Sequence, residues 1–255
     1  MKTEAVIFDW AGTTVDYGCF APVDAFIKAF EEFGITPTVD EVRAPMGMLK
    51  WNHIKEMLKG KRISDEWERI YSRKWNDEDV DRVYDKSEKS ILDIVSEYAA
   101  PKPYVIETVA GLREMGIKIG STTGYTDEMM NIVVPKAKEL GYSPDCWFSP
   151  NSVGNFGRPY PYMIFENMKK LEISSVENVI KVGDTISDIK EGKNAGVISV
   201  GVIEGSSVMA MSEENFNKLS DEEKAEVRKS VREKFMDAGA DYVIDDIRGI
   251  LELVK

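Results

Sequence analysis

Short apolar runs that end in a polar residue are the feature that most limits how this chain can fold. One such run, Ala5–Phe8, is rich in β-branched and aromatic residues, and Asp9 follows it directly. Similar runs lie at Ile117–Ser121, Val179–Val182 and Ile198–Val202, with helical periodicity between them. Runs of this kind are typical of parallel strands buried on both faces. The sequence therefore predicts an α/β fold with a doubly wound parallel sheet, whose ligand site lies at the carboxyl ends of the strands.

The stretch that follows the first predicted strand has a different pattern, because helical periodicities succeed one another without strands between them. Pro22 suits the first position of a helix, and Pro45 and Gly47 are expected to break a later helical region. Two domains are also the natural expectation for 255 residues. We expect an inserted helical cap domain at residues 21–102, and an α/β core domain at residues 1–20 and 103–255.

Composition excludes several classes of protein. The chain carries 33 basic and 45 acidic side chains, a formal charge of −12, which disfavours a nucleic-acid partner. No apolar run is long enough for a membrane span, and the N-terminal residues do not resemble a signal peptide, so we expect a cytoplasmic protein. Two cysteines, Cys19 and Cys146, and one histidine are too few for a disulfide framework or a zinc cluster.

Four polar motifs follow the predicted strands. They are Asp9–Thr14, Ser121–Gly124, Gly157–Pro159 and Gly183–Asp188. A single aspartate at the end of a strand is more often a cap or turn residue. The four motifs together, in this order, resemble those of the haloacid dehalogenase superfamily of phosphotransferases.

This resemblance implies a carboxylate nucleophile and a magnesium site. Asp9 would attack phosphorus and form an aspartyl-phosphate that water later hydrolyses. Phosphoryl oxygens repel carboxylates unless a divalent cation neutralises them, and Mg²⁺ prefers oxygen ligands. The resemblance implies that Asp9, Asp184 and the backbone carbonyl of Ala11 hold Mg²⁺, with Asp188 as a further ligand or just behind the ligands. Thr123, Gly124 and Arg158 would bind the phosphoryl oxygens.

The sequence departs from the superfamily pattern at one informative position. Phosphatases of the superfamily carry a second aspartate two residues after the nucleophile, which protonates the departing alkoxide, and here that position is Ala11. Without this general acid an ordinary phosphate ester has a poor leaving group. Either the chain is not a catalyst, or its leaving group is stabilised in another way.

The helical segment offers a candidate for that stabilisation in Lys50, with His53 three residues later. Taken alone, Lys50 would be a surface lysine and His53 a structural residue. However, most of the chain resembles the phosphonoacetaldehyde hydrolase (phosphonatase) family, which has alanine at the second motif position and a Schiff-base lysine in its cap. The matching segments are Asp9–Pro22, Pro45–Lys50 with His53, Gly120–Met130, Gly157–Pro161 and Lys181–Asp188.

The mechanism that this family implies needs no acid at position 11. Lys50 would condense with the aldehyde, and the electrons of the C–P bond would flow into the resulting iminium when Asp9 attacks phosphorus. The lysine must be neutral, so its pKa must fall from about 10.4 towards ~7, through desolvation beneath the cap and a nearby Mg²⁺. His53 would move protons or orient water. Met46 and Tyr125 would pack either beside the substrate or simply in the core.

Two alternatives stay open at this point. A general haloacid-dehalogenase-type phosphatase acting on a small metabolite would share every core residue, but Ala11 argues against it. A phosphate or phosphonate sensor without catalytic activity would not need the nucleophile or Lys50. The family also implies a homodimer. Cys19, at the junction of the two predicted domains, is expected to pack in the hinge rather than to react.

Overall fold

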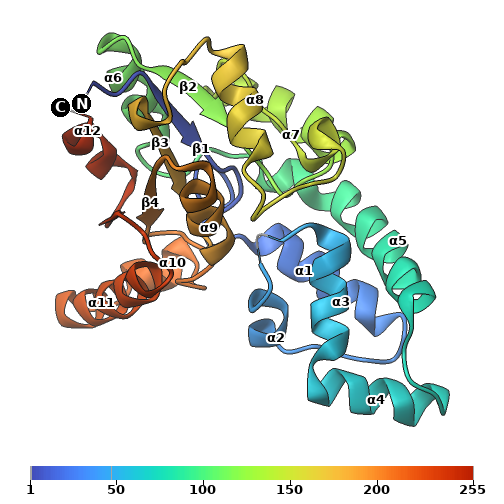
Figure 1. Cartoon of the computed structure of the whole chain (residues 1–255). Helices are drawn as coiled ribbons and strands as arrows, with labels where there is room; N and C mark the ends of the chain where they lie inside the picture. The colour runs from blue at the N-terminus through green and yellow to red at the C-terminus, as the bar shows by residue number, and fades with distance from the viewer. Residues whose placement is uncertain (1, 47, 255) are drawn as a thin grey trace.

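The computed structural model describes residues 2–46 and 48–254, and it contains a five-stranded sheet in which every pair of neighbouring strands is parallel (Figure 1). The strand order is β2-β1-β3-β4-β5. The strands are β1 (Ala5–Phe8), β2 (Lys118–Ser121), β3 (Val179–Gly183), β4 (Ile198–Val202) and β5 (Tyr242–Ile244). The predicted parallel sheet is confirmed. Its fifth strand was not predicted, because a three-residue strand gives too short an apolar pattern.

Helices cover both faces of this sheet, as a doubly wound fold requires. Successive side chains of β1 point to opposite faces: Val6 and Phe8 join the larger core cluster, and Ala5 and Ile7 join another. The first face is covered by α6 (Val105–Glu114), α7 (Asp127–Glu139) and α12 (Ile250–Leu253). The second is covered by α8 (Tyr162–Lys170), α9 (Ile186–Ala195) and α11 (Asp221–Asp237). Shorter helical turns are η1 (Val95–Tyr98), η2 (Pro150–Val153), η3 (Val176–Asn178), α10 (Glu213–Asn217) and η4 (Ile247–Gly249).

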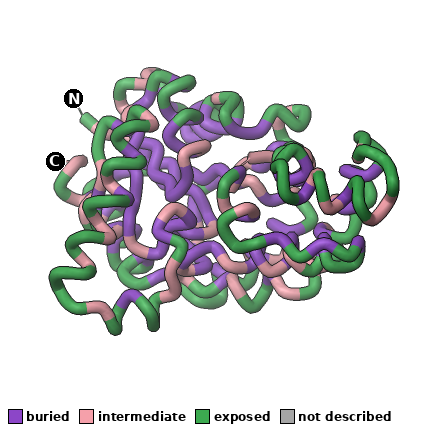
Figure 2. The backbone as a smooth tube through the Cα atoms, turned by 90° about the horizontal axis from the view of Figure 1, so that it is seen from below, coloured by how far each residue is buried: buried purple, intermediate pink, exposed green. Residues whose placement is uncertain are grey.

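The segment between β1 and α6 is helical and packs around an apolar core of its own. Its helices are α1 (Phe20–Glu31), α2 (Val39–Arg43), α3 (Lys50–Lys59), α4 (Lys61–Tyr71) and α5 (Asp77–Ile94). Phe30, Ile54 and Trp67 are fully buried in this second core, which is separate from those beside the sheet. Figure 2 shows buried backbone inside both parts, with exposed chain around each.

The start of α1 corrects one prediction. The helix begins at Phe20, two residues before Pro22, because the Asp16 carboxylate accepts hydrogen bonds from the backbone N–H groups of Phe20 (2.9 Å) and Ala21 (3.1 Å). Pro22 therefore lies at the third helical position. The first N–H groups of a helix have no intrahelical partner, so the N–H that proline lacks costs no hydrogen bond there. Pro45 lies in the predicted break, between α2 and α3. Gly47 lies outside the described residues.

None of the helices in the described part of the chain is both long enough and apolar enough to cross a membrane.

Candidate active site

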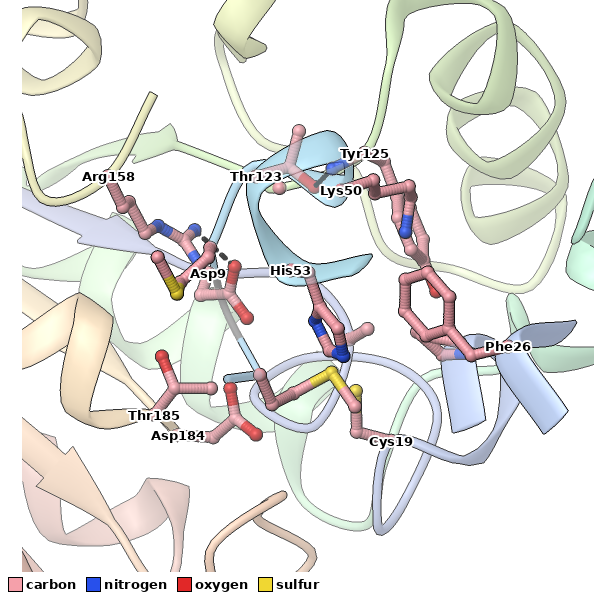
Figure 3. Close-up of a pocket in the computed structure, with 15 residues that line it drawn as sticks. Asp9, Cys19, Phe26, Lys50, His53, Thr123, Tyr125, Arg158, Asp184 and Thr185 are labelled. Carbon is pink, nitrogen blue, oxygen red and sulfur yellow. Dashed lines mark hydrogen bonds and ion pairs between the residues drawn. The ribbon is translucent and has the colours of Figure 1, made fainter. Parts of the chain in front are cut away.

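One pocket at the carboxyl ends of β1, β2 and β3 gathers nearly all the side chains singled out from the sequence (Figure 3). It lies between the sheet and the start of α3. Ten of the eleven candidate residues line it: Asp9, Ala11, Met46, Lys50, His53, Thr123, Gly124, Tyr125, Arg158 and Asp184. The eleventh, Asp188, lies behind this lining in contact with Arg158.

Three buried carboxylates form the polar floor of the site. Asp9, Asp184 and Asp188 each place an oxygen within 4.8 Å of the others. Burial raises the pKa of Asp9, and burial with the neighbouring acids raises the pKa of Asp184 well above its ordinary value. Burial also acts to raise the pKa of Asp188, but the charges of Arg158 and Lys181 outweigh this effect, so the pKa is lowered. The positive charges of the protein itself therefore do not offset the burial of Asp9 and Asp184.

The backbone beside these carboxylates is shaped to let them approach one another. Gly12 has φ of +85°, and a Cβ atom there would lie 2.0 Å from an oxygen of Asp184, so no larger residue fits. The Thr13 hydroxyl lies 3.4 Å from both Asp9 and Asp184, and the Ser207 N–H donates to Asp184 at 2.7 Å. Clustered carboxylate oxygens are the donors that a hard divalent cation prefers. The site can therefore hold such an ion.

Arg158 lines the pocket and is held in place by contacts with the buried carboxylates. Its guanidinium forms a short hydrogen bond with Asp9 and lies 3.1 Å from Asp188. Its Nε donates to Glu191 at 3.2 Å, and Nη2 donates to the Thr122 hydroxyl at 3.1 Å. The arginine is thus held on three sides, with one edge directed at Asp9.

Two residues that hold this arrangement were missed as site residues. Lys181 lies 2.8 Å from Asp188 and 3.5 Å from Glu191, and both acids are fully buried. Each gave a signal in the sequence. Lys181 is the one charge inside the apolar run of β3, where a lysine must be paired, and Glu191 follows Asp188 at the i,i+3 spacing of one helix face.

Lys50, the first residue of α3, lies in a different environment. It is buried, and its Nζ lies 4.7 Å from the ring centre of Tyr125 and 5.6 Å from that of Phe26. In the part of the chain that the structure describes, no carboxylate pairs with it. Burial lowers its pKa to about 8, and the charge of Glu88 acts in the opposite sense. Phe26 could not be distinguished from a core residue in the sequence, because its helix carries several such positions.

His53 lies one turn along α3 from Lys50 and faces the same pocket (Figure 3). Its ring stacks on Phe26, with ring centres 4.2 Å apart and planes at 23°. Burial, aided by the charge of Lys50, lowers its pKa to about 3, so the imidazole is neutral near pH 7. Its Nε2 is buried without a partner among the described residues. A neutral imidazole with such a nitrogen can accept a hydrogen bond and so hold a water molecule.

The remaining candidates shape the walls. The Thr123 hydroxyl accepts the N–H of Tyr125 at 3.0 Å, which fixes the turn after β2. Met46 lines the pocket, and its backbone carbonyl accepts a long hydrogen bond of 3.5 Å from Ser187. Cys19 lies at the predicted junction and is buried just before α1, and burial raises the pKa of its thiol well above the ordinary value. The thiol is therefore protonated and unreactive.

Comparisons with known proteins agree with this geometry. A family model described as haloacid dehalogenase-like hydrolase matches residues 3–196. The chain is 48% identical to phosphonoacetaldehyde hydrolase of Lysinibacillus sphaericus, over 100% of this chain and 95% of that protein. It is 51% identical to the Parabacteroides distasonis phosphonoacetaldehyde hydrolase, over 96% of this chain and 93% of that one. The chain belongs to the phosphonoacetaldehyde hydrolase family.

A solved structure extends the family resemblance to three dimensions. The crystal structure of a phosphonoacetaldehyde hydrolase-like protein from Oleispira antarctica superposes with a TM-score of 0.96 at 37% identity. The match covers 100% of this chain and 93% of that one, so it includes the helical segment as well as the sheet. The arrangement of both parts is therefore shared with that protein.

Proposed function

We propose that this chain hydrolyses the C–P bond of phosphonoacetaldehyde to give acetaldehyde and phosphate. One observation carries the proposal: a single pocket holds a carboxylate from the end of β1 and a lysine amine from α3 that no carboxylate of the described residues pairs with. Ala11, which also lines the pocket, provides no general acid for an ester substrate. The full-length relatives named phosphonoacetaldehyde hydrolase support the same substrate.

In this proposal Mg²⁺ is the resident metal ion. When bound, it would neutralise negative charge on the phosphoryl oxygens. Asp9 and Asp184 would hold it directly, and the Ala11 carbonyl is the further ligand that the family resemblance implies. Both oxygens of Asp188 are already engaged, one by Thr185 at 2.6 Å and the other by Lys181 at 2.8 Å. We therefore assign Asp188 to holding the surrounding cations rather than the metal.

Lys50 begins the reaction as a neutral amine. With a pKa of about 8, about one-tenth of it is neutral at pH 7, far more than for an exposed lysine. Its Nζ adds to the aldehyde carbon, and loss of water gives an iminium. The rings of Tyr125 and Phe26 lie close enough to stabilise this cation.

Asp9 then attacks phosphorus, and the C–P bond breaks. The bonding pair moves into the iminium and forms an enamine, so no alkoxide leaves and no acid is needed at position 11. Arg158, held beside Asp9, would receive the phosphoryl oxygens together with Thr123 and the Gly124 N–H.

Water completes the cycle in two hydrolyses. One releases phosphate from Asp9, and the other follows protonation of the enamine carbon and releases acetaldehyde from Lys50. His53 would orient water for these steps, because its imidazole is neutral and its Nε2 is buried without a partner among the described residues.

The family resemblance supports three wider predictions. Residues 21–102 act as a cap domain over a core of residues 1–20 and 103–255, since their helices bring Lys50 and His53 to the sheet. The chain forms a homodimer. It works in the cytoplasm on a small phosphonate, without nucleic-acid or membrane partners.

Phosphate release tests this function most simply. We expect rapid release from phosphonoacetaldehyde with Mg²⁺, loss of activity in excess chelator, and recovery when Mg²⁺ is restored. Small phosphate monoesters should be poor substrates, with the deficit in kcat, because they need an acid that Ala11 cannot supply. Comparable kcat/KM for a sugar phosphate and for phosphonoacetaldehyde would instead favour a general phosphatase.

A further inference from the structure

We infer that Arg43 is a positioning residue that pins the Lys50-bearing end of the helical segment to the core beside Asp184. The inference rests on the proposed function, in which Lys50 and Asp9 act on one substrate. Arg43 is the last residue of α2. It belongs to none of the four strand-end motifs, and it does not line the pocket that holds Asp9 and Lys50.

Arg43 reaches from α2 to a loop of the core. Its Nη1 donates to the backbone carbonyl of Ser207 at 3.2 Å and lies 3.5 Å from the Ser207 hydroxyl. Its guanidinium also lies over the ring of Phe20 at the start of α1, 4.9 Å from the ring centre. The side chain is therefore clamped between the first helix of the segment and the loop that follows β4.

The loop residue that Arg43 contacts also binds one of the buried carboxylates. The backbone N–H of the same Ser207 donates to Asp184 at 2.7 Å, and Ser207 is only 3% exposed. One peptide segment thus accepts a hydrogen bond from α2 and gives one to a carboxylate of the proposed metal site. Movement of α2 away from the core would loosen both.

The chain after Arg43 carries the residues that must meet the substrate. Three residues on, Met46 touches the core through its carbonyl and Ser187, and Lys50 begins α3. The Ser187 contact is long, at 3.5 Å, so the charged hydrogen bond of Arg43 is the stronger of these two attachments. Arg43 therefore fixes how deeply Lys50 enters the pocket.

The electrostatic setting favours a cation at this place. Burial lowers the pKa of Arg43, but the nearby charges of Asp16, Asp24 and Asp184 oppose that effect. Nε and Nη2 of Arg43 are buried without a partner in the portion of the chain that the structure describes. A neutral side chain would lose this attraction as well as the hydrogen bond to Ser207.

The test compares Arg43→Gln with a matched arginine of the same helical segment. Arg62 bonds to Glu41 and to the Thr36 carbonyl, so it too reaches the α2 region but not the core. We expect Arg43→Gln to lower kcat/KM for phosphonoacetaldehyde at least tenfold, and Arg62→Gln to change it less than twofold. Arg43→Lys, which keeps the charge and one donor, should recover part of the loss.

Hydrogen exchange provides a readout that needs no substrate. In Arg43→Gln we expect faster amide exchange in peptides spanning Leu49–His53 and in those containing Ser207, at an unchanged melting temperature. Arg62→Gln should leave both peptides as in the wild type. Unchanged exchange in Arg43→Gln, with kcat/KM within twofold of wild type, would overturn the inference.

Two further outcomes separate this inference from the proposed function. If Arg43→Gln does not fold, the comparison moves to Arg43→Met, which keeps an unbranched apolar stem but no donor, and exchange and kcat/KM at wild-type values in that variant would equally overturn the inference. If the wild-type protein does not turn over phosphonoacetaldehyde, the proposed function fails. The exchange measurement then still decides whether Arg43 pins the segment.

Discussion

The two sides of the pocket handle charge in opposite ways. On the core side two of the three buried acids lie against basic side chains: Asp9 meets Arg158, and Asp188 meets Arg158 and Lys181. On the helical side Lys50 and His53 touch aromatic rings, and burial lowers the pKa of both. Ion pairing keeps groups charged, whereas burial among apolar groups favours their neutral forms. One pocket can thus combine a carboxylate beside a fixed cation with an amine whose pKa burial has lowered.

Removing the charge of Asp9 should have the largest effect, because it breaks the core side of this comparison. In Asp9→Asn the amide cannot attack phosphorus, so kcat for phosphate release should fall at least about 100-fold, and towards ~10⁶-fold if this route is the only one. The helical side should still work: aldehyde with borohydride should still modify Lys50. Near-normal phosphate release by Asp9→Asn would rule out the nucleophile.

The pH dependence of kcat/KM sharpens the contrast from the helical side. Because the ammonium form of Lys50 cannot attack an aldehyde, kcat/KM should rise about tenfold per pH unit below pH 8 and level off above it. The charge of Glu88 raises the pKa of Lys50, so Glu88→Gln should move this limb to lower pH. If kcat/KM instead keeps rising to about pH 10, burial does not lower the pKa of Lys50.

Acid should weaken the fold through His53, a smaller effect on the same side. Its pKa is about 3 in the folded protein and about 6.5 when unfolded, so between these values the unfolded chain binds a proton that the folded one does not. The free energy of unfolding should therefore fall as pH drops below 6.5, by about 2 kcal/mol at pH 5. Urea unfolding at pH 7 and pH 5 measures this loss of stability. In His53→Gln the part of the loss that comes from His53 should be absent. Equal pH dependence in both proteins would contradict the assignment.

The core side was the easier part to predict from the sequence. Each of its motifs follows an apolar run, and the carboxyl ends of parallel strands meet at one edge, so Asp9, Thr123 and Asp184 could be placed together. Glu191 and Lys181 were not assigned roles, because one lies within a helix and the other within a strand. Their pairing is visible only once α9 packs on β3.

The helical side could be predicted only through the family resemblance. Nothing in the local pattern distinguishes Lys50 from a surface lysine, because its burial comes from Phe26 and Tyr125, which lie far away in the sequence. The predicted start of α1 was wrong for a similar reason. The Asp16 side chain caps it from outside the helix, and no spacing rule includes that contact.

Trapping the iminium tests the central claim most directly. Borohydride added with phosphonoacetaldehyde should inactivate the enzyme irreversibly, and peptide mass mapping should find an ethyl or phosphonoethyl group on Lys50. Lys50→Arg keeps the charge but cannot form the iminium, so it should be nearly inactive and unlabelled. The account is contradicted if the adduct maps to another lysine such as Lys55, or if Lys50→Arg retains substantial activity.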